Sequence, residues 1–275
     1  TLRWLKTAAH EVSLVVTHPP RESGRGRRVT PTPVAQVAKE LGLPLLEVED
    51  VNDPAVVSRL WSLEARVGLV IAFGQMLRDG VMSAFPCGCV NLHASLLPKF
   101  RGAAPIQWAI ARGDRETGVT IFRIVKRMDA GPILAQASTP IGDSETAGEL
   151  HDRLAELGVN AVGETLALLE TENPSGRDQV ESQVSLARKL VKRDGFIDFG
   201  QNVADLLRRI RAMTPWPGAI ARFEAADGRW ENVALLRVRG VVGPGGEPGV
   251  LDSRLWVGAK DGIIEIIELK PSSGR

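Results

Sequence analysis

The sequence predicts an α/β domain with a mostly parallel sheet, followed by a small β-barrel domain. Up to residue 171, short apolar runs alternate with helical patterns, which is typical of strand–helix–strand folds. Residues 67–72 are continuously apolar, as expected of a strand that is buried on both faces. Later in the chain, short β-rich runs are separated by Gly and Pro turns, and this pattern favours a barrel. We expect a first domain over residues 1–171, a linker over 172–190 and a second domain over 191–275.

Composition narrows the class of protein. Of the 275 residues, 44% are hydrophobic and 24% are charged, as in ordinary globular proteins. No apolar run approaches the roughly 18 residues of a membrane helix, and residues 1–10 lack the apolar core of a signal peptide. Cys87 and Cys89 have no second Cys/His pair to complete a metal site, so we expect reduced, buried thiols and no metal. We therefore expect a cytoplasmic protein that does not contact a membrane.

Local patterns predict the first elements of the chain. Helices are expected over residues 1–10, 32–42 and 53–63, and strands over 11–17, 43–48 and 67–72. Residues 18–31, between the first strand and the second helix, are expected to form a loop. The helix over 32–42 has Thr32 as its expected cap, and Gly42 ends it. The buried stripe expected of that helix consists of Val34, Val37, Ala38 and Leu41. A glycine turn at residues 73–77 follows the apolar strand.

Residues 21–28 carry four arginines and one glutamate, a local charge of +3 on a chain whose net charge is +1. The arginines are Arg21, Arg25, Arg27 and Arg28. This composition is typical of a solvated, mobile loop. Glycines interleaved with arginines also suit a flexible clamp for a polyanion, since arginine binds phosphate with two parallel hydrogen bonds. The residues alone leave both interpretations open.

Three polar side chains in residues 91–131 could do chemistry together. Asn91 and His93 end an apolar run over 87–92, and residues i and i+2 of a strand point to the same face. Asp129 follows a β-rich run over 119–125, and a second run over 133–138 would pair with it around this turn. An amide donor, an imidazole and a carboxylate can support acyl transfer without a covalent intermediate. Equally, an Asn-x-His at a strand end can be a capping Asn beside a satisfied histidine, and Asp129 can be an ordinary turn residue.

The second half of the chain begins with a long helix. Thr146 and Glu149 form a capping box for a helix that runs to about residue 169, with Leu150, Leu154 and Leu157 as its core stripe. Beyond the linker, we expect a helix over 203–213 and β-rich runs over 219–224, 233–242, 249–251, 255–257 and 262–269. The helix carries a basic cluster formed by Arg208, Arg209 and Arg211. These arginines are either phosphate contacts or part of a solvated face.

Several motifs in order resemble one family of enzymes. The sequence reads Asn-Leu-His-Ala-Ser-Leu-Leu-Pro at 91–98, Arg-Gly-Ala-Ala-Pro-Ile-Gln at 101–107, Thr-Gly-Val-Thr-Ile at 117–121 and Met-Asp-Ala-Gly-Pro-Ile-Leu at 128–134. With Gly-Arg-Gly-Arg at 24–27 and Pro-Trp-Pro at 215–217, these motifs resemble the formyltransferases that use 10-formyltetrahydrofolate. The run at 101–107 is most similar to the members that formylate methionyl initiator tRNA. The resemblance covers nearly the whole chain.

The resemblance implies a Rossmann-like formyltransferase domain and an OB-like C-terminal barrel. It implies that Asn91 and His93 stabilise the oxyanion, and that Asp129 assists proton movement and holds His93. It also implies that the folate is bordered by Ser95, Leu96, Leu97 and Pro98, and that the pterin pocket is lined by Phe73, Gly74, Met76 and Leu77. The expected formyl donor is 10-formyltetrahydrofolate.

The resemblance further implies contact with methionyl initiator tRNA through Arg25, Arg27 and Arg28, and through the cluster of Arg208, Arg209 and Arg211. We expect a monomer. Alternatives with the same chemistry are glycinamide ribonucleotide formyltransferase, formyltetrahydrofolate hydrolase and sugar N-formyltransferases, and a non-catalytic RNA-binding relative is a further one. The family opens on a strand ending in Gly-Thr-Pro and extends further at its end, so we expect this chain to lack the first strand and to be shortened at both ends.

Overall fold

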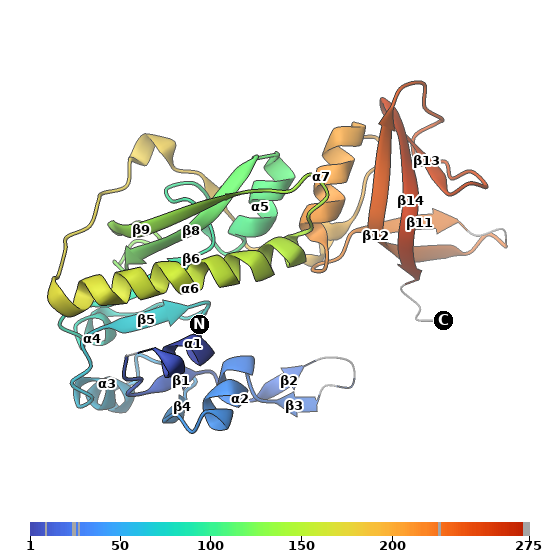
Figure 1. The fold of residues 1–275 in the computed structure, drawn as a ribbon. Coiled ribbons are helices and arrows are strands. Elements are labelled where there is room, and N and C mark those ends of the chain that lie inside the picture. Colours follow the sequence, from blue (N-terminus) through green and yellow to red (C-terminus); the bar gives the residue numbers. More distant parts are fainter. Residues whose placement is uncertain (9, 24–25, 27, 225–226, 272–275) are drawn as a thin grey trace. The chain divides into compact units, whose positions relative to one another are not determined.

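The structure is a computed structural model, and it describes residues 1–8, 10–23, 26, 28–224 and 227–271 (Figure 1). The chain forms two compact units. The first contains Thr1–His93, Val119–Ala137 and Ala155–Glu181, and the second contains Ala94–Gly118, Ser138–Leu154 and Ser182–Arg275. Because the chain passes between them more than once, single strands and one long helix contribute residues to both.

The first unit begins with short elements, in chain order α1 (Leu2–Thr7), β1 (Val15–Thr17), β2 (Arg21–Ser23), β3 (Arg28–Thr30), α2 (Pro33–Glu40), β4 (Leu45–Glu47) and α3 (Pro54–Trp61). β1 and β4 pair in parallel. The Thr32 hydroxyl accepts a hydrogen bond from the Ala35 amide, which confirms the predicted cap of α2. The predicted stripe is partly wrong, because Val34 is exposed whereas Ala35 and Ala38 are fully buried.

Residues 18–31 are a second correction, because they are not a plain loop. β2 and β3 pair as an antiparallel hairpin, with Arg21 opposite Thr30 and Glu22 opposite Val29. The sequence hid this hairpin because its strands are three residues long and carry charged and polar side chains, so they show no apolar alternation. Arg25 and Arg27 lie outside the described residues.

A four-stranded sheet forms the centre of the first unit, in the order β5 (Gly68–Ile71), β6 (Cys89–His93), β8 (Glu116–Arg123) and β9 (Ile133–Pro140). β5 and β6 are parallel, whereas β6 and β8 are antiparallel. α4 (Asp79–Met82) connects β5 to β6. The expectation that β5 is buried on both faces is wrong, since it is the outer strand of this sheet and its residues are half-buried or exposed.

The two cysteines are free and buried, as the sequence predicts. Burial raises the pKa of the Cys89 thiol to about 12, so this thiol is unreactive near neutral pH. Cys89 packs in a core with apolar residues from the preceding segments, including Val48, Leu60 and Val81. This core supports the start of β6, because Cys89 is the first residue of that strand.

α6 (Ala147–Thr171) begins at the predicted capping box. The Thr146 amide and hydroxyl donate to Glu149 Oε2 at 2.9 and 2.8 Å, and the Glu149 amide donates back to the Thr146 hydroxyl at 3.3 Å. Further along, Gly158 lies against β6: a Cβ at this position would come within 2.8 Å of Leu92 Cδ2. The glycine therefore allows the helix to pack closely on the strand that carries Asn91 and His93.

The second unit contains, in chain order, β7 (Arg101–Gly102), α5 (Pro105–Arg112), β10 (Leu186–Ala187), η2 (Lys192–Gly195), α7 (Val203–Met213), β11 (Ile220–Glu224), β12 (Trp230–Val242), β13 (Trp256–Ala259) and β14 (Gly262–Pro271), and η1 (Glu181–Gln183) precedes β10 at the join with the first unit. β11, β12, β14 and β13 form a curled antiparallel sheet in that order, and α7 packs on it. This arrangement confirms the small OB-like second domain.

Part of the stretch expected as a linker is held within the second unit by strand pairing and hydrogen bonds. β10 pairs in parallel with β7, and the Trp108 indole donates to the Arg188 carbonyl oxygen at 2.8 Å. Arg188 holds the buried Asp194 with two hydrogen bonds of 2.8 and 2.5 Å, and this contact lowers the pKa of the Asp194 carboxyl to about 2. The domain boundaries drawn from the sequence stay a prediction.

Among the helices that the structure describes, none combines the length and the apolar composition that crossing a membrane requires.

Candidate active site

Asn91 and His93 lie at the C-terminal end of β6, the second strand of the four-stranded sheet. Their i, i+2 spacing on a regular strand places both side chains on one face, as the sequence predicts. His93 is 7% exposed and its ring packs edge-on against Phe122, with ring centroids 6.4 Å apart. Asn91 is half-buried. The imidazole is thus held in a fixed orientation by a neighbouring strand.

Asp129 reaches His93 by an indirect route. β8 runs antiparallel to β6, with Arg123 opposite Val90 and Thr120 opposite His93, so β8 ends beside the start of β6. Residues 124–132 must therefore turn back along the sheet to bring Asp129 to the other end. They do so, and Asp129 Oδ2 lies 4.0 Å from His93 Nδ1, with the carboxylate side chain 16% exposed.

The turn back requires an unusual backbone. Asp129 has φ of +50°, a left-handed conformation that aspartate tolerates better than most residues. Gly131 is equally constrained, because a Cβ there would come within 1.7 Å of the Arg123 carbonyl oxygen. The Asp-Ala-Gly sequence is thus what allows the turn to fold.

Gln179 clamps this turn, and the sequence did not point to it. Its buried amide group donates to the carbonyl oxygens of Asp129 and Gly131, both at 2.8 Å. No local pattern could have identified it, because it lies 50 residues from Asp129 in a stretch that reads as linker. The glutamine side chain thus supplies two donors to the backbone at and directly after the candidate carboxylate residue.

The first candidate folate segment directly follows β6 and consists of Ser95, Leu96, Leu97 and Pro98. The Ser95 hydroxyl donates to the Lys99 carbonyl oxygen at 2.6 Å, and Leu97 is 3% exposed. The serine and this leucine therefore also shape the turn itself.

The second folate segment is the turn that leaves β5. Phe73 is half-buried, Gly74 has φ of +79°, and Met76 is 66% exposed. Leu77 instead packs into the core around Val81, so its side chain supports the turn. The parallel register places Ile71 opposite Leu92, so this turn begins beside the end of β6.

The candidate nucleic-acid residues differ in how they are placed. Arg28 is exposed on β3. Arg208 forms an ion pair with Asp205, and Arg209 is half-buried near Asp194, whose pKa it helps to lower after the larger effect of Arg188. These two arginines of α7 already have acidic neighbours within their own unit.

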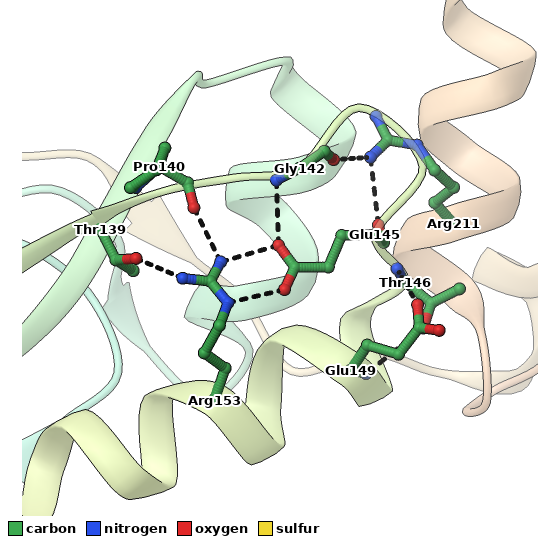
Figure 2. A network of polar contacts seen from close by, with 8 residues as sticks. All are labelled: Thr139, Pro140, Gly142, Glu145, Thr146, Glu149, Arg153 and Arg211. Atoms are coloured by element: carbon green, nitrogen blue, oxygen red, sulfur yellow. Dashed lines mark hydrogen bonds and ion pairs between the residues drawn. The ribbon is translucent and has the colours of Figure 1, made fainter.

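Arg211 takes part in a network of hydrogen bonds and ion pairs (Figure 2). It donates to the Gly142 and Glu145 carbonyl oxygens at 2.9 and 3.0 Å, and burial lowers the pKa of its guanidinium. On the other side of the same turn, Arg153 binds Glu145 through two nitrogens at 2.9 and 2.8 Å and lowers the pKa of that carboxyl. Arg211 therefore joins α7 to the turn before α6, and this structural role is independent of any phosphate contact.

Within the residues that the structure describes, no group of three or more His, Cys, Asp or Glu side chains is placed to hold a metal ion.

Comparison with known proteins gives matches over both units. The formyl transferase family model matches residues 2–166, and the model of the formyl transferase C-terminal domain matches residues 189–275. The methionyl-tRNA formyltransferase of Methylococcus capsulatus is 41% identical over 278 residues, covering all of this chain and 89% of that protein. The methionyl-tRNA formyltransferase of Paracoccus denitrificans is 40% identical over 268 residues, covering 98% of this chain and 87% of that protein.

Solved structures share the fold at lower identity. An N-formyltransferase from Helicobacter canadensis, in complex with folinic acid and dTDP-3-aminofucose, has a TM-score of 0.69 at 16% identity and covers 96% of this chain and 93% of its own. HypX from Aquifex aeolicus, in complex with tetrahydrofolic acid, has a TM-score of 0.67 at 18% identity and covers 94% of this chain. This chain spans 44% of HypX, less than half its length.

The clamp formed by Gln179 leads to a first prediction. Gln179→Ala removes both donors from the turn at residues 124–132, so its backbone amides should exchange with solvent about fivefold faster, the effect of removing hydrogen bonds that together contribute roughly 1 kcal/mol. Amide hydrogen exchange read by mass spectrometry measures this. Gln183→Ala, at an exposed glutamine, is the control. Unchanged exchange over 124–132 in Gln179→Ala would show that other contacts hold the turn.

Proposed function

The chain belongs to the formyl transferase family, and we propose that it transfers the formyl group of 10-formyltetrahydrofolate to the α-amino group of methionyl initiator tRNA. The relatives that are about 40% identical over the whole chain carry the name methionyl-tRNA formyltransferase. The observation that carries the chemistry is the meeting of Asn91, His93 and Asp129 at one strand end. An amide donor, an imidazole and a carboxylate in this arrangement can support acyl transfer.

The reaction requires one bond to form and one to break. The α-amino nitrogen attacks the formyl carbon, the bond from that carbon to the folate nitrogen breaks, and a proton from the amine ends on the folate nitrogen. Negative charge develops on the formyl oxygen as the amine attacks. Asn91 and His93, side by side on β6, are the proposed donors to this oxygen.

Asp129 is proposed to hold His93 and to assist the proton transfer. The distance of 4.0 Å between Oδ2 and Nδ1 is longer than a hydrogen bond. Catalytic hydrogen bonds are often long without substrate and shorten in the complex. The positive-φ turn that carries Asp129 is clamped by Gln179, so a small movement of the side chain would complete the contact.

The donor would bind at the turn after β5 and along Ser95, Leu96, Leu97 and Pro98. Phe73 and Met76 offer an aromatic and an exposed apolar side chain, which suit the flat pterin ring. Gly74 is exposed between them, and its lack of a side chain would let a flat ring approach the backbone closely. The donor's own chemistry supplies the activated formyl group.

For the acceptor, the hairpin of β2 and β3 is the proposed contact. Arg28 is exposed there, and Arg25 and Arg27 add charge by sequence. Arg208, Arg209 and Arg211 are weaker candidates than the sequence implied, since each has a protein partner or an acidic neighbour. We propose that the hairpin makes the main phosphate contacts, and that the chain works as a monomer in the cytoplasm.

An acceptor assay tests the proposed function. Radiolabelled 10-formyltetrahydrofolate is incubated with the protein and methionyl initiator tRNA, a dTDP-amino sugar, glycinamide ribonucleotide or water alone. We expect formyl transfer to the tRNA at least about a hundredfold faster than to any other acceptor, the discrimination that a site built for a different polar substrate supplies. Faster transfer to the sugar or to water would replace this function with one of the alternatives.

The catalytic side chains lead to the second prediction. Asn91→Ala and His93→Ala should each lower kcat about 100-fold or more, the usual effect of removing a donor to a developing oxyanion. Asn160→Ala and His151→Ala, at exposed positions on α6, are matched controls and should behave as the parent. Circular dichroism and thermal melting establish that the variants fold. Near-normal turnover in a folded Asn91→Ala or His93→Ala protein would remove that residue from the mechanism.

The hairpin leads to the third prediction. Removing one phosphate-binding side chain should flatten the dependence of log Kd for tRNA on log salt by ~0.7–0.9. Arg25→Ala and Arg28→Ala should therefore weaken tRNA binding most at low salt and leave tetrahydrofolate binding unchanged. Arg59→Ala, on the exposed face of α3, is the control. If the salt slopes of the hairpin variants equal that of the parent, the hairpin does not hold the tRNA, and Arg209 becomes the leading candidate.

A further inference from the structure

His18 follows β1 directly and lies between two segments of the first unit. On one side is Arg21, at the base of the β2–β3 hairpin. On the other side is the turn after β5: the His18 ring stacks on Phe73, with ring centroids 5.6 Å apart and planes at 22°. His18 Nε2 also lies 3.1 Å from the Phe73 carbonyl oxygen. One half-buried ring thus contacts both segments.

The neighbours of the ring indicate which of its nitrogens donates and which accepts. A carbonyl oxygen only accepts, so Nε2 is the donor to Phe73. His18 Nδ1 lies 3.3 Å from Arg21 Nη2 and 3.3 Å from Gln75 Nε2, which are both donors. The orientation of the Gln75 amide is set by a backbone amide on its oxygen and a backbone carbonyl on its nitrogen. In this arrangement His18 Nδ1 is therefore the acceptor and Nε2 is the donor.

The turn that His18 contacts adjoins the catalytic strand end. β5 and β6 are parallel, and Ile71 is opposite Leu92, so β5 ends next to His93. Gln75 anchors the same turn, because its side chain accepts from the Val51 amide at 2.8 Å. The hairpin base, the His18 ring, the turn and the end of β6 therefore form a continuous series of neighbours.

Arg21 has a second partner that limits its movement. It forms an ion pair of 2.7 Å with Glu49, while Glu49 offers its backbone carbonyl to Gln75. The charged and titratable groups around the ring are thus Arg21 and Glu49, and the exposed ion pair alone is expected to contribute little. His18 contacts the hairpin base through the Arg21 guanidinium, and it contacts the turn after β5 through Phe73 and Gln75.

We propose that His18 is a positioning residue for the reaction, and that it holds the hairpin and the turn after β5 in one arrangement. The inference rests on the proposed function for what these segments bind, namely the tRNA acceptor and the folate donor. Without the polar contacts of the ring, the protein binds both substrates more weakly. The rate at saturation changes little, because the side chains that act on the formyl group lie on β6 and after β8.

Two substitutions separate the ring's polar contacts from its shape. His18→Phe keeps an aromatic ring to stack on Phe73 but removes the donor and the acceptor. His18→Gln restores one amide donor and one carbonyl acceptor. We expect His18→Phe to raise the KM for methionyl initiator tRNA about tenfold and the KM for 10-formyltetrahydrofolate severalfold, with kcat within about twofold of the parent. His18→Gln should recover most of both KM values. His151→Phe, at an exposed histidine, is the control.

Two results would overturn the inference. One is a His18→Phe protein with the kinetics of the parent, and the other is a fall in kcat at unchanged KM. Failure of the parent itself to formylate methionyl initiator tRNA would instead refute the proposed function. Hydrogen exchange without substrates tests the role of His18 independently of the proposed function. His18→Phe should speed exchange at residues 28–30 and at residues 73–77, and His18→Gln should restore the slower exchange of both segments. If His18→Phe does not fold, Gln75→Met, which removes the contact from the turn side, must still raise the KM for tRNA.

Discussion

The antiparallel pairing of β6 with β8 dictates how the candidate site is assembled. It places the end of β8 beside the start of β6, whereas His93 lies at the other end of β6. The Asp129 carboxylate can therefore approach His93 only if residues 124–132 turn back along the sheet. That turn needs a left-handed residue at Asp129, a glycine at Gly131 and the two hydrogen bonds from Gln179. The approach of Asp129 to His93 therefore depends on residues from several separate segments of the first unit.

Interactions between near neighbours in the chain could be predicted from the sequence. The Thr146–Glu149 capping box, the Thr32 cap and the bounds of α7 were all predicted correctly, because each depends on residues a few positions apart. The contact of Gln179 with Asp129 was missed because the two residues are distant in the chain. The β2–β3 hairpin was missed although it is local, because its short, charged strands show no apolar alternation. Asn91, His93 and Asp129 were identified through the motifs that contain them. Their spacing alone did not decide whether they act together.

The arginines show why composition is a poor guide to partners. The chain is nearly neutral, and several arginines that are suited to binding phosphate serve the fold instead. Arg211 holds the turn before α6, Arg153 holds Glu145 and Arg188 holds Asp194. Arg28 on the hairpin is among the exposed basic side chains of the described residues. The β2–β3 hairpin is the surface proposed for nucleic acid, and His18 contacts both its base and the turn after β5.

Whether Asp129 acts through His93 can be decided by a double-mutant cycle on kcat/KM for formyl transfer. The cycle compares the parent, His93→Gln, Asp129→Asn and the double variant. If the carboxylate works by holding the imidazole, Asp129→Asn should slow the parent at least about tenfold but slow His93→Gln by less than about threefold, because coupled residues are not additive. Equal factors in both backgrounds would show that Asp129 acts independently of His93, which is the opposite of the role proposed for it.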